Sequence, residues 1–376
     1  MYQIIDFLKE IPNPCYVLEE NKFIKNMETF RLLEKVSGAK VLCALKGFSS
    51  WYVFPEMKNF ITGATASSLN EAKLIFDEMG CKAHCCFVVY DENEFNELQS
   101  ISSHVTFNSL NQFKKFKHSL KPDVKYGIRI NPEYSAVSYD KYNPCASGSR
   151  LGVIKDKMPN ELPEGITGIH FHSLCESGAS DLENILEVVE SNFGHLLHQA
   201  DWVNIGGGHL ITKENYNTEL LIELISNLRQ NYNVDVFLEP GEAIGWNTGC
   251  LLSKVEDIVE NNGETTAILN VSFAAHMPDC LEMPYKPSVI NESKSGINYT
   301  LGGNTCMSGD FVKGFCFDVK LNVNDNVIFK DMLHYTFVKS SFFNGVKHPS
   351  LGLITKENKF KLLKSFGYSD YKYRLS

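Results

Sequence analysis

The sequence lacks a long apolar run, a surplus of basic residues and an N-terminal leader. Its 376 residues include 36 lysines and arginines against 45 aspartates and glutamates, giving a formal net charge of -9. No stretch approaches the length of about 20 apolar residues that crosses a bilayer. The first six residues, MYQIID, lack the basic start and apolar core of a signal peptide. An acidic chain is also a poor general binder of nucleic acid. We therefore expect a soluble, cytosolic protein with neither a membrane nor a nucleic-acid partner.

Paired cysteine spacings are absent as well. The 11 cysteines are scattered along the chain, whereas a secreted disulfide scaffold would be shorter and denser in cysteine. The segment Cys81-Lys-Ala-His84-Cys85 has no second half that would complete a zinc site. We expect most of these thiols to be small buried hydrophobes, and we expect no metal site.

Eight short apolar, β-branched runs alternate with segments of helical period over the first two thirds of the chain. This alternation predicts a (β/α)8 TIM-like barrel. A doubly wound sheet ranks second, because such sheets usually stop at five or six strands. The predicted strands are 40–46, 61–67, 84–90, 104–108, 125–131, 166–173, 202–208 and 234–241, and the clearest predicted helices are 68–79, 91–101, 180–197 and 219–231.

The pattern changes after Trp246. Short apolar runs separated by Asn, Gly and Asp clusters predict an antiparallel β domain with hairpin turns. The N-terminal run 12–18 is expected to supply another strand of that domain. We therefore predict a barrel domain at 21–246 and a β domain made of 1–20 and 247–376. The predicted strands after the barrel include 252–259, 266–272, 327–329 and 335–339.

Unusual residues fall where the predicted barrel strands end, which is the end that carries catalytic groups in such barrels. Lys46 finishes the first strand. Desolvation there would lower the pKa of its amine and make it a nucleophile able to form a Schiff base. The plainer interpretation is a lysine that extends to solvent.

Three other strand ends add complementary groups. His170 and His172 follow the sixth strand, three glycines follow the seventh, and Glu239 follows the eighth. Alone, each has an ordinary explanation, such as a core histidine pair or a tight turn. Together, the lysine, a glycine loop able to bind phosphate and a carboxylate are what pyridoxal phosphate requires.

Seven motifs then carry a resemblance to a known family. In order and spacing, the chain resembles the alanine-racemase-fold (fold type III) decarboxylases that use pyridoxal phosphate. Within them it is most similar to the carboxynorspermidine (carboxyspermidine) decarboxylase group, over nearly its whole length. The motifs are Ala44-Leu45-Lys46, His170-Phe171-His172, Gly206-Gly207-Gly208-His209, Glu239-Pro240-Gly241-Glu242, His276-Met277-Pro278-Asp279, Gly303-Asn304-Thr305-Cys306 and Phe342-Phe343-Asn344-Gly345.

The resemblance implies roles for the cofactor residues. Lys46 would hold pyridoxal 5'-phosphate covalently and His172 would stack on its ring. Glu239 would keep the ring nitrogen protonated, and Arg129 would support that carboxylate. The phosphate would be bound by the remaining members, Gly206, Gly207, Gly208 and Tyr335.

It also implies a homodimer with shared active sites. Cys306 would reach the partner subunit's site and protonate the substrate carbon after carbon dioxide leaves, and Asp310 lies nearby in the sequence. Relatives acting on ornithine or diaminopimelate carry Glu-Pro-Gly-Arg, whereas this chain has Glu242 in place of the arginine. This reversal of charge favours an amine tail over a distal carboxylate. Glu242 and Asp279 would therefore bind a cationic triamine substrate, and Asp310 is expected to assist as a further substrate-binding residue.

The implied reaction is decarboxylation of carboxynorspermidine or carboxyspermidine to norspermidine or spermidine in polyamine biosynthesis. The sequence does not choose between the two substrates, which differ by one methylene. Another fold type III decarboxylase, for diaminopimelate or ornithine, is opposed by Glu242. A racemase would need a tyrosine in place of Cys306, and an inactive regulatory relative would typically have lost Lys46 or Cys306. Cys175 and Arg150 are left with packing and surface pairing as their default roles.

Overall fold

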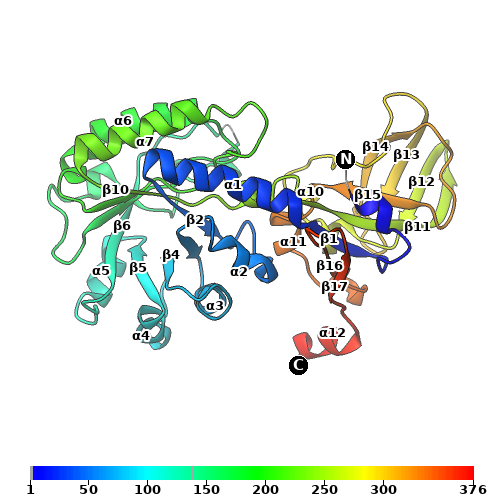
Figure 1. The fold of residues 1–376 in the computed structure, drawn as a ribbon, viewed down its shortest axis with the longest axis horizontal. Coiled ribbons are helices and arrows are strands. Elements are labelled where there is room, and N and C mark those ends of the chain that lie inside the picture. The colour runs from blue at the N-terminus through cyan, green and yellow to red at the C-terminus, as the bar shows by residue number, and fades with distance from the viewer. Residues whose placement is uncertain (1–2, 138) are drawn as a thin grey trace. The chain divides into compact units, whose positions relative to one another are not determined.

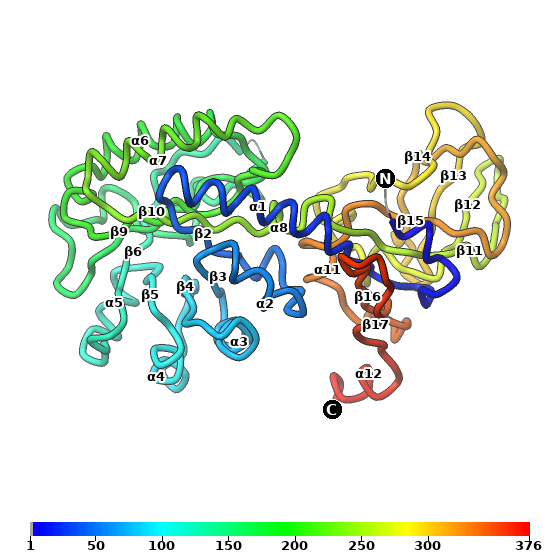
Figure 2. The backbone as a smooth tube through the Cα atoms, in the orientation of Figure 1, coloured from blue at the N-terminus to red at the C-terminus, as the bar shows by residue number. Residues whose placement is uncertain are grey.

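The structure is a computed structural model that describes residues 3–137 and 139–376. Its contacts divide the chain into two compact units, shown in Figures 1 and 2. The barrel unit is Asn26–Ile244, and the sheet unit combines Met1–Lys25 with Gly245–Ser376. The functional domains expected at 21–246 and at 1–20 with 247–376 remain a prediction.

Eight parallel strands close into a barrel in the first unit. Their order is β5-β4-β3-β2-β10-β9-β8-β6, and pairing of β5 with β6 completes the ring. Each of the eight predicted runs overlaps one of these strands, although β4 and β5 begin one and two residues before their runs, so the predicted barrel is confirmed. The strands are β2 (Lys40–Ala44), β3 (Gly63–Ala66), β4 (Ala83–Phe87), β5 (Ser102–Phe107), β6 (Lys125–Asn131), β8 (Gly168–His170), β9 (Trp202–Asn204) and β10 (Asp235–Leu238), with the short β7 (Val153–Ile154) beside β6.

Helices surround these strands, as Figure 1 shows for α4 to α7. The longest, α6 (Ala179–Leu197), buries residues at spacings of three and four, which is the apolar stripe of an amphipathic helix. The backbone N–H of Gly178 donates to the Asp181 carboxylate and caps its first turn. The other helical segments are α1 (Glu20–Ser37), η2 (Trp51–Val53), α2 (Phe54–Met57), α3 (Leu69–Leu74), η3 (Ile75–Met79), α4 (Glu92–Ser100), α5 (Leu110–Phe116), η4 (Asp140–Tyr142), η5 (Lys155–Lys157), α7 (Thr218–Tyr232) and α8 (Glu242–Gly245).

Side chains fill the barrel interior, so it is a packed core and not a channel. Trp202 packs with Leu42 and Phe237. A Cβ on Gly168 would lie 1.9 Å from the indole of Trp202, so only glycine leaves room for this ring. His84 and His104 stack nearby, with ring centroids 3.9 Å apart.

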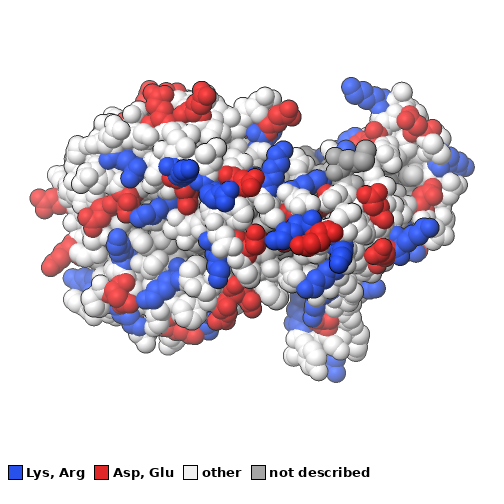
Figure 3. Space-filling model, viewed as in Figure 1, with Lys and Arg blue, Asp and Glu red and all other residues white. Residues whose placement is uncertain are grey.

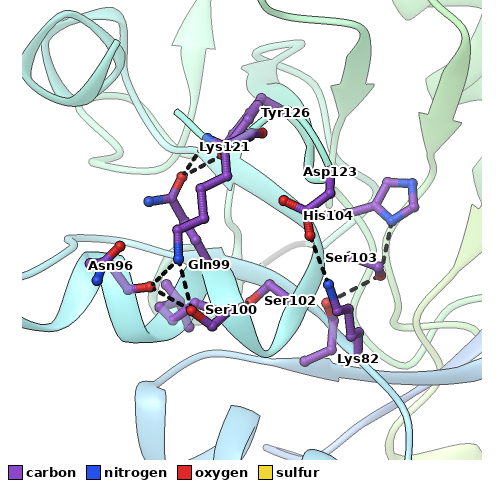
Figure 4. Close-up of polar contacts among 12 residues, drawn as sticks. Lys82, Asn96, Gln99, Ser100, Ser102, Ser103, His104, Lys121, Asp123 and Tyr126 are labelled. Carbon is purple, nitrogen blue, oxygen red and sulfur yellow. Dashed lines mark hydrogen bonds and ion pairs between the residues drawn. The ribbon is translucent and has the colours of Figure 1, made fainter. Parts of the chain in front are cut away.

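The strand starts are tied together by polar contacts, shown in Figure 4. Lys121 lies in the loop before β6, and its Nζ donates to the Asn96 carbonyl at 3.0 Å and to Ser100 Oγ at 2.8 Å, both on α4. The Lys121 backbone N–H donates to Gln99 Oε1 at 3.1 Å and to Tyr126 Oη at 2.8 Å. This end of a barrel usually serves stability, which leaves the opposite end for chemistry.

The sheet unit contains one eight-stranded sheet of order β14-β13-β12-β11-β1-β16-β17, with β15 paired to β11. The N-terminal strand β1 pairs antiparallel with β11 and parallel with β16, which confirms the predicted contribution of the N-terminus. The sheet is mostly antiparallel, although β12 and β13 are parallel. Its strands are β1 (Cys15–Glu19), β11 (Gly249–Asn261), β12 (Glu264–Leu269), β13 (Ile297–Gly302), β14 (Phe311–Phe317), β15 (Asn326–Lys330), β16 (Ser350–Ile354) and β17 (Phe360–Lys364).

One predicted strand of this unit is wrong. The run 335–339 forms the helix α11 (Tyr335–Val338), in which the N–H of Lys339 donates to the Tyr335 carbonyl at 2.9 Å. Aromatic and β-branched residues favour strands, but packing decides such short runs, and here the helical turn buries Thr336. The unit's other helical segments are η1 (Gln3–Phe7), α9 (Phe273–His276), α10 (Asp279–Glu282), η6 (Phe343–Gly345) and α12 (Tyr368–Leu375).

Charge is mixed on the surface. Basic and acidic side chains are interspersed over the face shown in Figure 3. Within residues 3–137 and 139–376, every helix is too short or too polar to cross a membrane.

Candidate active site

The barrel unit brings the predicted lysine beside the turn that carries two predicted carboxylates. Lys46 lies in the turn after β2, and the N–H of Ala44 donates to the Pro240 carbonyl at 2.9 Å. A Cβ on Gly47 would lie 2.8 Å from Gly241 Cα and 2.9 Å from the backbone nitrogen of Glu242. The chain after Lys46 therefore packs directly against the turn Glu239–Glu242.

The surroundings of Lys46 favour the neutral amine. Burial of the amine among protein atoms lowers its pKa, the Glu239 carboxylate opposes this and the Arg129 guanidinium reinforces it. The side chain keeps contact with solvent, so its amine remains accessible to a small molecule. An amine with a lowered pKa and an accessible nitrogen is suited to attack a carbonyl carbon.

Glu239 is oriented by a residue outside the predicted set. Asn204, at the end of β9, donates from Nδ2 to Glu239 Oε1 at 2.8 Å. Its Oδ1 accepts the backbone N–H of Gly206 at 2.9 Å. Asn204 is only 2% exposed, so one buried amide fixes both the carboxylate and the first glycine of the triplet. The sequence feature that could have identified Asn204 is its position, as a polar residue at the end of an apolar strand just before the glycines.

The second oxygen of Glu239 faces a neutral histidine. His170 Nε2 lies 3.8 Å from Glu239 Oε2, and neither ring nitrogen of His170 has a hydrogen-bond partner within the described residues. Burial lowers the pKa of His170 to about 4 even though Glu239 raises it. Glu239 therefore has one oxygen that Asn204 does not bind.

His172 is held as a neutral ring beside the glycine triplet. The N–H of Gly207 donates to His172 Nδ1 at 2.9 Å, so the ring proton lies on Nε2. Burial, followed by the positive charges of Lys46 and Arg129, lowers the pKa of His172 well below its usual value. A half-buried, uncharged ring of fixed orientation can stack on an aromatic ligand.

The glycine triplet packs too closely for side chains. A Cβ on Gly206 would lie 2.6 Å from the Phe171 carbonyl oxygen, and one on Gly207 would lie 2.2 Å from that of Glu239. Gly208 has φ +88°, a conformation that L side chains rarely adopt. Among the described residues no hydrogen-bond partner is found for the Gly208 N–H, which leaves this donor available to an anion.

Arg129 does not hold Glu239 in the way we expected. It lies in β6, 9% exposed, and its Nη2 donates to the His172 carbonyl at 3.5 Å. No ion pair between Arg129 and Glu239 is found in residues 3–137 and 139–376, where Asn204 makes the direct contact instead. Arg129 also acts on Cys86, whose thiol pKa burial raises to about 11 against the lowering effect of the guanidinium.

Together these residues fit a flat aromatic cofactor that bears an aldehyde, a ring nitrogen and a phosphate. Lys46 offers the amine, His172 the neutral stacking ring and Glu239 a charged oxygen. The glycine loop offers bare backbone where a Cβ would clash. In residues 3–137 and 139–376 no group of three metal-binding side chains is found.

The turn carrying Glu242 shares this neighbourhood. Burial raises the pKa of the Cys175 thiol to about 11, and the charges of Glu176 and Glu242 add to this while Lys46 opposes it. Glu242 and Lys46 therefore act on the same thiol. A half-buried carboxylate placed here can attract a cation toward Lys46.

The sheet unit carries the predicted acid on an exposed loop. Cys306 lies between β13 and β14 and is exposed. Asp310 is 4% exposed, and its carboxylate accepts Thr305 Oγ1 at 2.5 Å, the Thr305 N–H at 3.2 Å and the Ala274 N–H at 3.0 Å. These bonds make Asp310 the support of the Cys306 loop. Its predicted contact with substrate stays a prediction.

Asp279 already has a cationic partner in this unit. Lys339, just after α11, makes ion pairs with both Asp279 and Glu282 on α10. Burial lowers the pKa of Lys339, but the two carboxylates outweigh it and the net direction is upward. The three side chains together carry one net negative charge. The sequence did not identify Lys339 as a partner of Asp279, because the two residues are distant in the chain and only the fold brings them together.

Tyr335, the predicted phosphate-binding tyrosine, begins α11 and is half-buried. The predicted site residues therefore form two groups. Those in the barrel unit are Lys46, Arg129, His172, Gly206, Gly207, Gly208, Glu239 and Glu242, and those in the sheet unit are Asp279, Cys306, Asp310 and Tyr335.

Comparison with known proteins gives a consistent result. Residues 16–332 match the family model described as pyridoxal-dependent decarboxylase, C-terminal sheet domain. The chain is 45% identical over 374 residues to carboxyaminopropylagmatine decarboxylase of Synechocystis sp., covering 98% of this chain and 96% of that protein. It is 41% identical to carboxynorspermidine/carboxyspermidine decarboxylase of Campylobacter jejuni, covering 98% of this chain and 100% of that protein.

The solved structures agree. The crystal structure of carboxynorspermidine decarboxylase from Campylobacter jejuni, complexed with norspermidine, superposes with a TM-score of 0.91 at 40% identity, covering 97% of this chain and 100% of that one. The diaminopimelate decarboxylase of Helicobacter pylori, at 16% identity, 99% and 98% coverage and a TM-score of 0.81, shares the fold. The resemblance that the motifs indicated is thereby confirmed, and the chain belongs to the pyridoxal-dependent decarboxylase family.

Proposed function

We propose that this decarboxylase binds pyridoxal phosphate through Lys46 and removes carbon dioxide from carboxynorspermidine or carboxyspermidine. The products are norspermidine or spermidine, in polyamine biosynthesis. The observation that carries the substrate class is Glu242, whose backbone lies against the residue after Lys46. Relatives named for carboxynorspermidine/carboxyspermidine at 41% and 32% identity support it. A cytoplasmic homodimer completes the proposal.

The barrel residues would prepare the cofactor. When bound, pyridoxal phosphate supplies an electron-withdrawing ring that accepts the electron pair left as carbon dioxide departs. Glu239, held by Asn204, would keep a proton on the ring nitrogen, and the neutral His172 would stack on the ring. The lowered pKa of Lys46 favours the free amine, which would hold the cofactor through its aldehyde group.

The sheet unit would complete the reaction from the partner subunit. Cys306 gives its thiol proton to the α-carbon that has lost its carboxylate, and water restores the proton to sulfur. An exposed cysteine on a loop supported by Asp310 is accessible for this role. Glu242 and Asp279 bind the cationic tail, because each carboxylate offers oxygens to an ammonium.

A second candidate substrate is carboxyaminopropylagmatine. The relative named for it is 45% identical over 98% of this chain. Its substrate ends in a guanidinium, which also pairs with carboxylates and prefers a two-pronged contact. Both candidates are cationic amino acids, so the Glu242 argument serves either.

The test is release of carbon dioxide by the purified, cofactor-loaded enzyme. Carboxynorspermidine, carboxyspermidine, carboxyaminopropylagmatine, diaminopimelate and ornithine would be compared by kcat/KM. We expect the triamine and agmatine substrates to exceed diaminopimelate by at least about a hundredfold, since bringing a distal carboxylate beside the Glu242 carboxylate costs several kcal/mol. Preference for diaminopimelate would refute the assigned substrate class.

The variant Glu242→Arg isolates the proposed determinant. It should weaken the cationic substrates far more than it weakens cofactor binding, because it places a positive charge beside the substrate tail. Equal losses of both would mean that Glu242 serves the fold. The matched variant Glu176→Arg changes the charge of an exposed residue near the same thiol and should spare the substrate.

A further inference from the structure

Cys306 receives a hydrogen bond from a residue with no role assigned above. Asn344 Nδ2 donates to Cys306 Sγ at 3.0 Å, across 38 positions of sequence. All 11 cysteines lie within the described residues, and Cys306 is the exposed one among them. A thiol that is exposed and yet held by a donor differs from the other ten, which are buried or half-buried.

The two partners are anchored to the same short helix, α9. On one side, the Ala274 N–H donates to the Asp310 carboxylate, which supports the Cys306 loop. On the other side, the Ala275 carbonyl accepts the Ser341 N–H at 2.7 Å, three residues before Asn344. Neighbouring peptide groups of one helix therefore set the spacing between the donor and the thiol.

The backbone at Asn344 suits an asparagine. Its φ is +58° and its ψ is +7°, in the left-handed region that most side chains avoid. Asparagine and glycine adopt this region most readily. Only asparagine of these two also carries an amide able to donate to sulfur.

We propose that Asn344 is a positioning residue for the acid Cys306, an inference that rests on the proposed function of this thiol. In the protonation step the S–H bond breaks and a C–H bond forms at the substrate carbon that lost its carboxylate. The electron pair stays on sulfur, where the N–H of Asn344 donates to the developing thiolate. Because sulfur accepts from Asn344, the thiol hydrogen remains free to point at the substrate.

Alkylation of Cys306 by iodoacetamide tests this without substrate. The rate would be followed from pH 6 to pH 10 by mass spectrometry of the Cys306 peptide. Asn344→Gly keeps the left-handed backbone and removes the donor, while Asn344→Asp keeps the shape and replaces the donor with a negative charge. The control Asn291→Gly alters another exposed asparagine of the same unit, with φ +64°.

We expect the midpoint of the alkylation profile to rise by about 0.5–1 pH unit in Asn344→Gly, because one hydrogen bond to an anion is lost. The rise should be larger in Asn344→Asp and absent in Asn291→Gly. In both Asn344 variants kcat should fall roughly fivefold to tenfold, within the range for a weakened general acid, with KM and cofactor affinity retained.

The outcomes separate this inference from the function it rests on. If the alkylation profile of Cys306 is unshifted in both Asn344 variants, the positioning role of Asn344 is overturned and the proposed function is not affected. Full turnover by Cys306→Ala overturns Cys306 as the acid, and the role of Asn344 with it. A shifted profile together with a reduced kcat supports both.

Discussion

The two groups of candidate site residues are held in different ways. In the barrel unit, Lys46, His172 and Glu239 follow parallel strands, and a buried amide and a backbone N–H fix the orientation of Glu239 and His172. In the sheet unit, Cys306 lies on a loop supported by the Asp310 carboxylate and receives a hydrogen bond from the Asn344 amide. Asp279 lies on a short helix and pairs with Lys339. The first group is fixed by the strand register of the barrel, and the second depends on a few local contacts.

This difference suggests a division of labour. The barrel group has uncharged histidines and a lysine of lowered pKa, as suits a cofactor that must be bound in one orientation. The sheet group has an exposed thiol and paired carboxylates, as suits a substrate that enters and leaves. Apart from Glu242, expected to bind substrate, and Tyr335, expected to bind the cofactor phosphate, changes in the barrel group should act on the cofactor and changes in the sheet group on turnover.

The largest effect is expected at Lys46. Lys46→Ala removes the amine that binds the cofactor, so activity should fall by about a thousandfold or more, equivalent to about 4 kcal/mol. Absorbance of the bound cofactor should be lost with it. Lys40→Ala is the control, since Lys40 begins the same strand and pairs with Asp235 at 2.7 Å. Retained absorbance and activity in Lys46→Ala would rule out the proposed mechanism.

Cys306→Ala should act on turnover alone. Loss of a general acid lowers kcat by roughly a hundredfold or more. Cofactor absorbance should be unchanged, because the thiol belongs to the sheet unit. Cys316→Ala, at a half-buried position of β14, is the control. If Cys306→Ala released the cofactor, the division between the two groups would be wrong.

The barrel group was largely predictable from the sequence. Each barrel strand is visible in the sequence as a short apolar run, and all parallel strands of a barrel end at the same end of it. The residues that follow β2 and β10, Lys46 and Glu239, could therefore be placed near each other from the sequence. The partner of Glu239 could not be. Arg129 was expected beside the Glu239 carboxylate, whereas Asn204 donates the hydrogen bond to it. The alternation of side chains along a strand predicts which face a side chain lies on, but not which neighbouring group it contacts.

The sheet group was less predictable. Its elements are short and joined by turns, and the run 335–339 favoured a strand by propensity although it folds as α11. The paired residues Lys339 and Asp279 are 60 positions apart in the sequence, so no local sequence pattern predicts their ion pair. The Asn344 motif was visible in the sequence, whereas its bond to Cys306 required the fold.

Acid should weaken the barrel unit more than the sheet unit. Within residues 3–137 and 139–376, burial lowers the pKa of five histidines of the barrel unit, and it also lowers the pKa of His276 and His348 in the sheet unit. A histidine whose folded pKa is lowered takes up protons more readily when unfolded, so stability is complete above about pH 6.5 and falls toward the folded pKa. The five are His84, His104, His170, His172 and His209.

His104 gives the matched test. Its pKa is lowered by burial to about 4. As the pH falls from about 6.5 to about 4, protonation of His104 in the unfolded state should lower the free energy of unfolding by roughly 3 kcal/mol. His104→Asn should flatten the pH dependence of the urea-unfolding free energy by about that amount. The exposed His118→Asn should leave it unchanged. Identical slopes in the two variants would contradict the assignment.

Asn204→Asp tests whether the barrel group depends on one amide. An aspartate at this position would still accept the Gly206 N–H but could not donate to Glu239. It would also place a second carboxylate beside that of Glu239. Cofactor affinity should fall about tenfold or somewhat more, as expected for loss of a hydrogen bond to a charged group. Asn108→Asp is the control, because Asn108 makes the same two kinds of bond, to Arg150 and Gly152, after β5. Equal affinities in the two variants would exclude a special role for Asn204.

The smallest effect is expected at Lys339, and it bears on the sheet group alone. Lys339 neutralises part of the charge of Asp279 and Glu282, and a substrate ammonium would have to share those carboxylates with it. Lys339→Met should therefore lower KM for the cationic substrate about threefold and leave kcat and cofactor affinity unchanged, since the ion pairs of a partly exposed lysine are screened by solvent and are worth about 1 kcal/mol. Lys286→Met, which breaks the pair with Glu292 in the same unit, should leave KM unchanged. A higher KM in Lys339→Met would show instead that Lys339 holds Asp279 in its binding position, and the sheet group would then be as preorganised as the barrel group.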